Sequence, residues 1–129
     1  MLTKPAVGYA TALPRESVYD VPCPLIHALG LIGGKWKLPV LWHLADSGGC
    51  GFNALGREVT GITNTMLGKC LKELEHDGLV CRTEMAGNMR RVEYSLTPQG
   101  WLLLPALKEL YQWGKAHLES SVESGTSRT

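Results

Sequence analysis

The four cysteines, Cys23, Cys50, Cys70 and Cys81, are the most reactive side chains in this 129-residue sequence. They form no Cys-x-x-Cys pair, and no histidine stands at zinc-ligand spacing, so we expect no metal and no cofactor. Cys23 directly precedes Pro24, a residue suited to the first turn of a helix. Free N–H groups at a helix start favour the nucleophilic thiolate, which makes Cys23 a candidate redox-sensing residue.

Two alternatives to a reactive Cys23 stand beside this interpretation. Cys23 can instead be a buried cysteine that only caps the helix and packs against its neighbours, because apolar surroundings disfavour the reactive thiolate. Cys50, in the glycine-rich segment "SGGCG", is the competing reactive thiol. Cys70 and Cys81 fall on the apolar faces of a predicted helix and strand, where cysteine usually acts as a small hydrophobe.

A second set of polar side chains lies in "TNTMLGKCLKELEHDGLV", residues 63 to 80. At 100° per residue, one helical face collects the apolar residues Met66, Leu67, Cys70, Leu71 and Leu74. The other face begins with short polar residues and continues with two lysines, whereas the acids Glu73, Glu75 and Asp77 come last. This order opposes the helix dipole, which prefers acids first and cations last, and it indicates a partner outside the helix.

Duplex DNA accounts for this charge order. When the N-terminal end of a helix enters the major groove, short polar residues reach base edges and lysines pair with phosphate or guanine. The late acids then lie where the helix leaves the groove. The predicted DNA-binding residues of this helix are Thr63, Asn64, Thr65, Gly68, Lys69 and Lys72. The alternative is an ordinary solvated helix face, and the hairpin that follows favours DNA over it.

After Gly78 the apolar period changes from helical to two, which predicts a β-hairpin with Gly87-Asn88 at its tip. Arg90 and Arg91 of this hairpin complete the predicted DNA-binding set. Neighbouring strand residues point to opposite faces, so one of the two arginines is a candidate structural residue instead.

The other segments supply the frame that holds these residues. Residues 1–20 are predicted to form a flexible arm, residues 21–118 the folded domain and residues 119–129 a disordered tail. "CPLIHALGLIGG" predicts a short buried helix, "KWKLPVLWHL" a core helix, and "NALGREV" a helix capped by Asn53. A glycine-containing turn joins this last helix to the one capped by Thr63, and Thr97-Pro98 opens a final helix that runs to about Leu118. The predicted fold is mainly α with a small β-hairpin wing, a winged helix-turn-helix.

The final helix carries two apolar stripes. The first holds Leu103, Leu104, Leu107, Leu110, Tyr111 and Leu118, and the second holds Leu102, Ala106 and Trp113. One stripe packs against the domain core, and the other would stay exposed to solvent in a monomer. This exposed apolar stripe predicts a dimer. The four tryptophans, Trp36, Trp42, Trp101 and Trp113, are expected in the core rather than in a ligand cage, and His43 is expected to be a satisfied interior residue.

Composition limits the function classes. A net charge of +1 does not by itself indicate a nucleic-acid or membrane partner, so any contact with DNA must come from a local patch of basic residues. No apolar run approaches the roughly 18 residues of a membrane helix, and the chain is expected to be cytoplasmic, with no membrane partner. No nucleophile-base set, phosphate loop or carboxylate pair predicts an enzyme. The alternative function is a small-molecule-binding sensor of the same fold without redox chemistry.

Several quoted segments together resemble the HxlR family of bacterial winged-helix regulators, which is related to the MarR type. They are "CPL", "LIGGKWKLPVLWHL", "FNALGREVTGIT", "MLGKCLKELEHDGLV", "RVEYSLTPQG" and "LLPALKELYQWG", in order from about Cys23 to Leu118. The resemblance implies a homodimeric repressor or activator that binds double-stranded DNA and dimerises through its outer helices. It also places Cys23 at the family's N-terminal cysteine position, which implies sensing of electrophiles or oxidants. The predicted effector is a small electrophile, oxidant or aldehyde, since each of these can modify a reactive thiolate.

Overall fold

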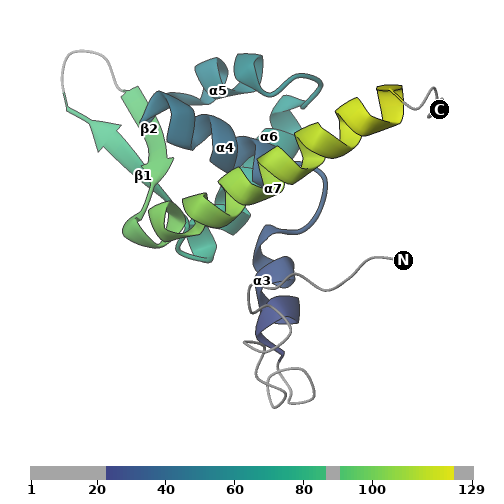
Figure 1. Ribbon diagram of the computed structural model, residues 1–129. Helices are drawn as coiled ribbons and strands as arrows, with labels where there is room; N and C mark the ends of the chain where they lie inside the picture. Colours follow the sequence, from purple (N-terminus) through teal and green to yellow (C-terminus); the bar gives the residue numbers. More distant parts are fainter. Residues whose placement is uncertain (1–22, 87–90, 124–129) are drawn as a thin grey trace. The chain divides into compact units, whose positions relative to one another are not determined.

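The computed structural model describes residues 23–86 and 91–123. The chain divides into two compact units, Met1–Gly33 and Gly34–Thr129. Among the described residues, the first unit contains helix α3 (Pro24–Ile32), and the second contains four further helices and a two-stranded sheet (Figure 1).

Helix α3 begins and ends where the sequence predicts. Pro24 occupies its first turn, Cys23 is the N-cap residue and Gly33 is the C-cap residue. The expectation of a buried helix is wrong, because no residue of α3 is buried, and Leu25, Ile26 and Leu29 are largely exposed. A nine-residue helix has too little surface to enclose its own apolar side chains.

The second unit has a winged helix-turn-helix architecture, as predicted. Its elements are α4 (Lys37–Ser47), α5 (Phe52–Glu58), α6 (Asn64–His76), β1 (Val80–Met85), β2 (Arg91–Leu96) and α7 (Pro98–Glu123). Helices α4, α5 and α6 and strand β1 supply the fully buried apolar core, and β2 and α7 add the nearly buried Leu96 and Leu107. The fully buried residues are Val40, Leu41, Leu44, Leu55, Leu67, Leu71, Leu74 and Val80. This core fixes α5 and α6 as the two helices of the helix-turn-helix.

Local capping explains the helix boundaries. The Thr63 hydroxyl accepts a hydrogen bond from the Met66 amide at 3.1 Å, which confirms Thr63 as the N-cap of α6. Gly78, at φ +80°, follows the end of α6 in the left-handed region that favours glycine. The predicted Asn53 cap is wrong, because α5 begins at Phe52 with Gly51 as N-cap.

The early start of α5 follows from the sheet. The Cys50 amide donates to the Tyr94 carbonyl at 3.0 Å, and the Tyr94 amide donates back to the Cys50 carbonyl at 2.8 Å. Cys50 therefore forms an isolated antiparallel bridge with Tyr94 of β2, in the segment between α4 and α5. β1 and β2 pair antiparallel from Val80 opposite Leu96 to Met85 opposite Arg91. The predicted tip at Gly87-Asn88, and Arg90 with it, lies outside the described residues.

Helix α7 is anchored at its first turn by Thr97. The Thr97 hydroxyl donates to the Gly78 carbonyl at 2.6 Å and accepts from the Gly100 amide at 3.1 Å. The helix continues to Glu123, past the predicted end at Leu118, so residues 119–123 of the expected tail are helical.

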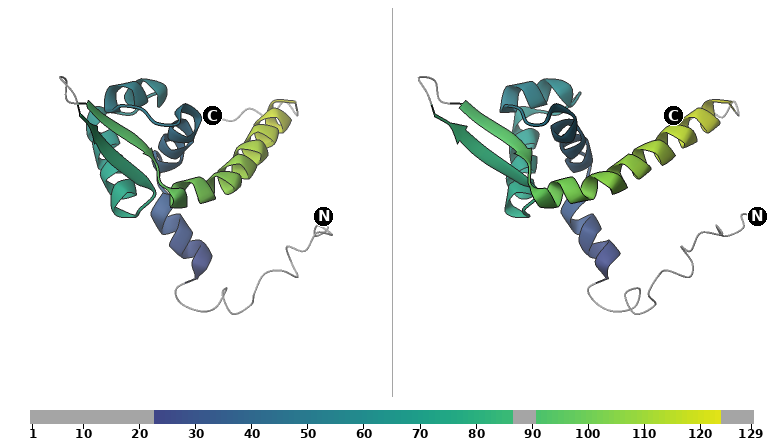
Figure 2. Two further views of the ribbon diagram at one scale, coloured as in Figure 1. Left: turned by 90° about the vertical axis from the view of Figure 1, so that its left-hand side faces the viewer. Right: turned by 60° about the vertical axis from the view of Figure 1, so that its left-hand side comes forward.

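The predicted burial along α7 is only partly right. Leu107 is buried and Leu103 and Leu104 are half-buried, but Leu110, Tyr111 and Leu118 of the same stripe are exposed. A helix of 26 residues is about 39 Å long, more than this small domain can cover, and its C-terminal half extends past the other elements (Figure 2). Trp113, in this half, is exposed rather than in the core. Trp101, in the first turn of α7, is also exposed, while Trp36 and Trp42 are half-buried.

Candidate nucleic-acid interface

Helix α6 presents one apolar face to the core and one polar face to solvent. Its buried residues are Leu67, Cys70, Leu71 and Leu74. On the opposite side, successive turns carry Thr65, Lys69, Lys72 and His76, all exposed, and we call these four residues the outer face of α6. Thr63 and Asn64, at the start of the helix, are exposed as well. The structure thus brings five of the six residues predicted from this segment onto one accessible surface.

Gly68, the sixth, faces a different direction. A Cβ atom added to Gly68 would lie 4.0 Å from Cε2 of Phe52 in α5, so the residue faces the first helix of the motif. Gly56 of α5 approaches α6 closely too, since its added Cβ would lie 3.5 Å from Cδ2 of Leu67. These small residues let the two helices pack closely, and a role of Gly68 in close approach to DNA stays a prediction.

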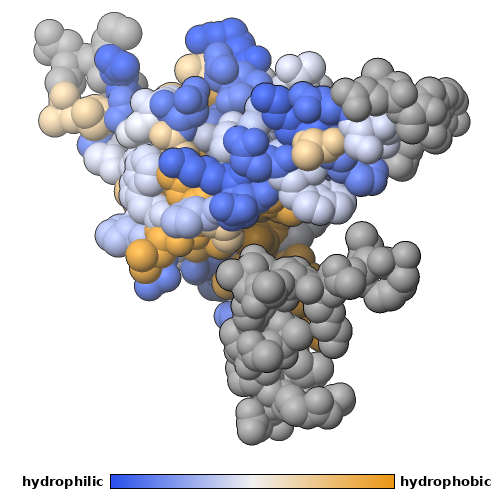
Figure 3. All heavy atoms as spheres, in the orientation of Figure 1, coloured by the Kyte–Doolittle hydropathy of each residue, from blue (hydrophilic) through white to orange (hydrophobic). Residues whose placement is uncertain are grey.

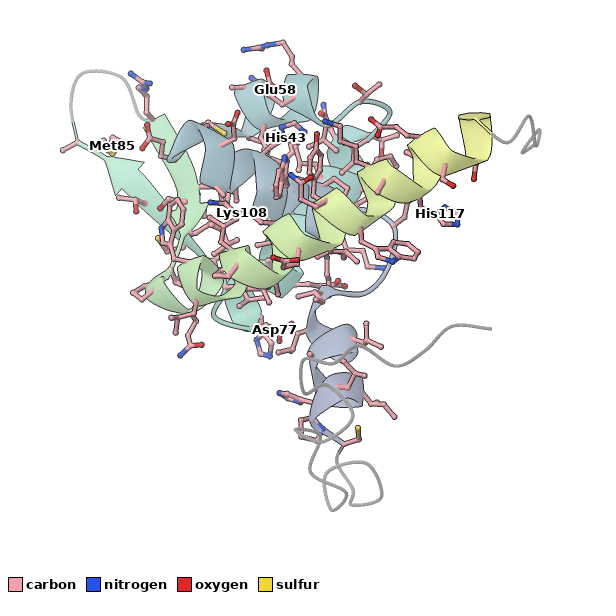
Figure 4. The ribbon with its side chains drawn as sticks, viewed as in Figure 1. His43, Glu58, Asp77, Met85, Lys108 and His117 are labelled. Atoms are coloured by element: carbon pink, nitrogen blue, oxygen red, sulfur yellow. The ribbon has the colours of Figure 1, made fainter. Side chains whose placement is uncertain are left out.

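Two side-chain contacts join α4 to the helix-turn-helix, one ion pair and one contact between a histidine and a carboxylate. Lys37 Nζ lies 3.3 Å from Glu73 Oε1 of α6, and only 15% of the Lys37 side chain is exposed. His43 Nδ1 lies 3.9 Å from Glu58 Oε1 of α5, and both residues are labelled in Figure 4. His43 is half-buried rather than interior. The Lys37 pair also explains why Glu73 is compatible with a DNA-facing helix, because its charge is already compensated.

The lysines of the outer face have no such compensation. Among the residues that the structure describes, neither Lys69 nor Lys72 forms an ion pair. Two exposed cations on consecutive turns, beside short hydroxyl and amide side chains, form a surface suited to phosphate and base edges.

The two described arginines of the wing, Arg82 and Arg91, differ in the partners that they contact. Arg82 Nη1 lies 3.4 Å from Glu84 Oε2, and a hydrogen bond with the Tyr94 side chain raises the pKa of the Arg82 guanidinium above its ordinary value. Arg82 is thus engaged within the sheet. Arg91, at the start of β2, is exposed and remains the described arginine of the predicted set.

All four cysteines are free thiols, but their surroundings differ. Cys23 is half-buried at the N-cap of α3, and its side chain makes no capping hydrogen bond. Cys81 Sγ lies 3.2 Å from Ser95 Oγ across the hairpin. Cys70 is buried in α6 as predicted, and desolvation by burial raises the pKa of its thiol to about 11.

Cys70 is therefore expected to resist alkylation in the native protein. A raised pKa keeps the thiol protonated at pH 8, so only on the order of one molecule in a thousand carries the reactive thiolate there. Limited iodoacetamide labelling, followed by peptide mass spectrometry, should modify Cys50 well before Cys70, and urea should equalise them. Equal labelling rates in the native protein would contradict the described burial.

Comparison with known proteins identifies the family of this helix-turn-helix. Residues 31–122 match the model of the family described as "HxlR-like helix-turn-helix". The chain belongs to the HxlR-like helix-turn-helix family. It is therefore a DNA-binding transcriptional regulator, as the sequence predicted.

Individual relatives agree with this assignment. A putative regulatory protein, MalR, from Fusobacterium mortiferum is 39% identical over 103 residues, which cover 80% of this chain and 95% of MalR. The redox regulator HypR in its reduced form superposes with a TM-score of 0.71 at 39% identity, over 78% of this chain and 98% of HypR. Diamide-treated YodB from B. subtilis superposes with a TM-score of 0.64 at 28% identity, over 75% of this chain and 96% of YodB.

Two further classes of site were sought in the described part of the chain. Residues 23–86 and 91–123 contain no group of three or more His, Cys, Asp or Glu side chains placed to hold a metal ion. None of their helices is long and apolar enough to cross a membrane.

Proposed function

We propose that this regulator binds a palindromic operator as a two-fold dimer, with the outer face of α6 in the major groove of each half-site. The observation that carries the proposal is the pair of uncompensated lysines, Lys69 and Lys72, on a helix whose opposite face is buried. Thr63, Asn64 and Thr65 read base edges, and Arg91 of the wing contacts the neighbouring backbone. A cytoplasmic location belongs to the same proposal.

The exposed apolar residues of α7 support the dimer. A regulator that stayed monomeric would leave Leu102, Leu110, Trp113 and Leu118 in water along one long helix. Figure 3 shows apolar surface over the start of this helix, beneath a band of hydrophilic residues. The exposed leucines of α3 supply a second apolar element. To read the two half-sites of a palindrome, the two copies of α6 in the dimer lie about 34 to 36 Å apart, one turn of DNA.

Removing a lysine of the outer face tests the proposal. Lys69→Ala and Lys72→Ala are each expected to weaken binding to all duplexes, and to reduce the slope of log affinity against log salt by about one unit. Fluorescence anisotropy at salt concentrations from about 50 to 300 mM measures both the affinity and the slope. Lys115→Ala, an exposed lysine on α7, is the matched control and should leave the slope unchanged. Unchanged slopes for both α6 variants would refute a phosphate-contacting role.

A thiol switch at Cys23 is the second part of the proposal. The redox regulator HypR has been solved in reduced and oxidised forms, and one YodB structure is of diamide-treated protein. Cys23 here is a free thiol at a helix start with no capping bond. Modification of Cys23 by an electrophile, oxidant or aldehyde alters α3, changes the dimer and so resets the spacing of the two α6 helices.

Operator binding titrated against diamide or methylglyoxal checks this switch. The wild type and Cys50→Ser are expected to change affinity together as the reagent is added, whereas Cys23→Ser should not respond. If Cys23→Ser responds to the reagent like the wild type, the sensing residue is not Cys23. If Cys50→Ser does not respond, the sensing residue is Cys50.

A hollow between α4 and α7 supports the alternative, regulation by a small molecule without redox chemistry. It has a volume of about 260 Å³ and is lined by Trp42, Ala45, Asp46, Leu104 and Lys108. Trp42 also stacks on Tyr111, with ring centroids 4.9 Å apart. A ligand in this hollow would act on α4, whose side chains contact both helices of the motif. A response of DNA binding to cell metabolites that persists in a cysteine-free variant would favour this alternative.

A further inference from the structure

We infer that Met66, in the first turn of α6, reads a thymine in each operator half-site through the C5-methyl group. The inference rests on the proposed entry of α6 into the major groove. It adds an apolar residue to the polar residues that the sequence predicts to determine specificity.

The exposure of Met66 is the first observation. The sequence places Met66 in the buried stripe of α6, yet 42% of the residue is exposed, whereas its neighbour Leu67 is fully buried. Helical geometry explains the difference, because consecutive residues are turned by about 100° and Met66 falls at the edge of the buried stripe. A large apolar side chain is thus left in water beside Thr65 of the outer face.

The position of Met66 along the helix is the second observation. Its amide donates to the Thr63 cap at 3.1 Å, so the residue belongs to the capped first turn. The first turn of a recognition helix is the part that meets base edges. The major groove is about 12 Å wide and a helix with its side chains is about 10 to 12 Å across, so the sides of this turn face the groove as well.

The chemistry of the side chain then selects the base. Asn64 and Thr65 supply hydrogen bonds, whereas the thioether of Met66 is at most a weak acceptor. The thymine methyl is the apolar group that a base pair presents in the major groove. Contact between the two removes both from water, and Met adapts its shape readily to such a partner.

Deoxyuridine provides the sharpest probe, because it differs from thymidine in this groove only by the absent methyl group. Operators are first selected from random duplexes with the full-length wild type, Met66→Ala, Met66→Leu and Met85→Ala. Met85 is the matched control, since it is 44% exposed but lies at the end of β1 in the wing (Figure 4). Each thymine of the selected half-site is then replaced by deoxyuridine, and affinities are compared.

The wild type is expected to select thymine at one position of each half-site. Deoxyuridine there should weaken binding about fourfold per methyl, the factor that corresponds to burial of one CH₂ group. Met66→Ala should lose the thymine preference at this position only and bind both duplexes equally, while Met66→Leu and Met85→Ala keep it.

Two results would overturn the inference. One is a Met66→Ala protein that still prefers thymine over deoxyuridine at every position where the wild type does. The other is a wild type with no methyl-sensitive position. Neither result touches the proposed function, which fails separately if the Lys69 and Lys72 variants retain the full salt slope. Thermal unfolding followed by circular dichroism verifies that each Met66 variant is folded.

Discussion

Replacing Leu102 and Trp113 together by glutamate is expected to convert the regulator into a monomer and to lower its affinity for a two-half-site operator at least about a hundredfold. The two residues are 72% and 66% exposed and lie on the same side of α7, three turns apart. Charges placed there cost the folded domain little, because both side chains already face water. In a dimer interface they would be buried without partners, at a cost of roughly 3 kcal/mol or more.

Analytical ultracentrifugation and anisotropy with operator duplexes measure the two effects. The matched control is Gln112→Glu, which adds a charge to an exposed position of the same helix away from this side. The double variant should still bind an isolated half-site as the wild-type monomer does. A double variant that sediments as a dimer at micromolar concentration would show that this side of α7 is not the interface.

Gly100→Ala is expected to have the largest effect on stability, lowering the free energy of unfolding by about 3 kcal/mol. Gly100 is buried in the first turns of α7, and an added Cβ would clash with the carbonyl oxygen of Leu79 and lie 3.2 Å from Cβ of Leu96. The obstruction is backbone, which cannot rotate away as a side chain can. The start of α7 must therefore move away from the segment before β1, which strains the hydrogen bonds that Thr97 donates to the carbonyls of Gly78 and Leu79.

Gly114→Ala on the same helix isolates this clash from the change in helix propensity. No atom lies within 4 Å of its added Cβ, so alanine should stabilise the helix by about 0.5 to 1 kcal/mol. Urea denaturation monitored by circular dichroism provides both values. Equal stability of the two alanine variants would contradict the close packing of α7 against Leu79 and Leu96.

Features governed by neighbouring residues could be predicted from the sequence. The Thr63 cap, the glycine after α6 and the proline-led start of α3 follow from local hydrogen bonds and backbone preferences. The same local rules misplace the start of α5. The backbone pairing of Cys50 with Tyr94, residues distant in sequence, decides it.

Burial and pairing depend on the whole fold and were harder to predict. An apolar stripe shows that a helix must be covered, but not whether its own chain or a second copy covers it, which is why α3, Trp101 and Trp113 were misplaced. The ion pair between Lys37 and Glu73 joins α4 to α6 and has no signal in either segment alone. Periodicity groups Met66 with the buried residues of α6 because it does not resolve the edge of a stripe.

The central claim is that the outer face of α6 lies against bases in the major groove. Site-specific photocrosslinking tests it most directly, with benzoylphenylalanine placed at Thr65 in one variant and at Lys115 in a control. The Thr65 probe is expected to crosslink to bases at two symmetric positions of the operator about one helical turn, or 34 to 36 Å, apart, and the Lys115 probe to none. A Thr65 probe that forms no base crosslink, in a protein that still protects the operator, would show that another surface reads the DNA.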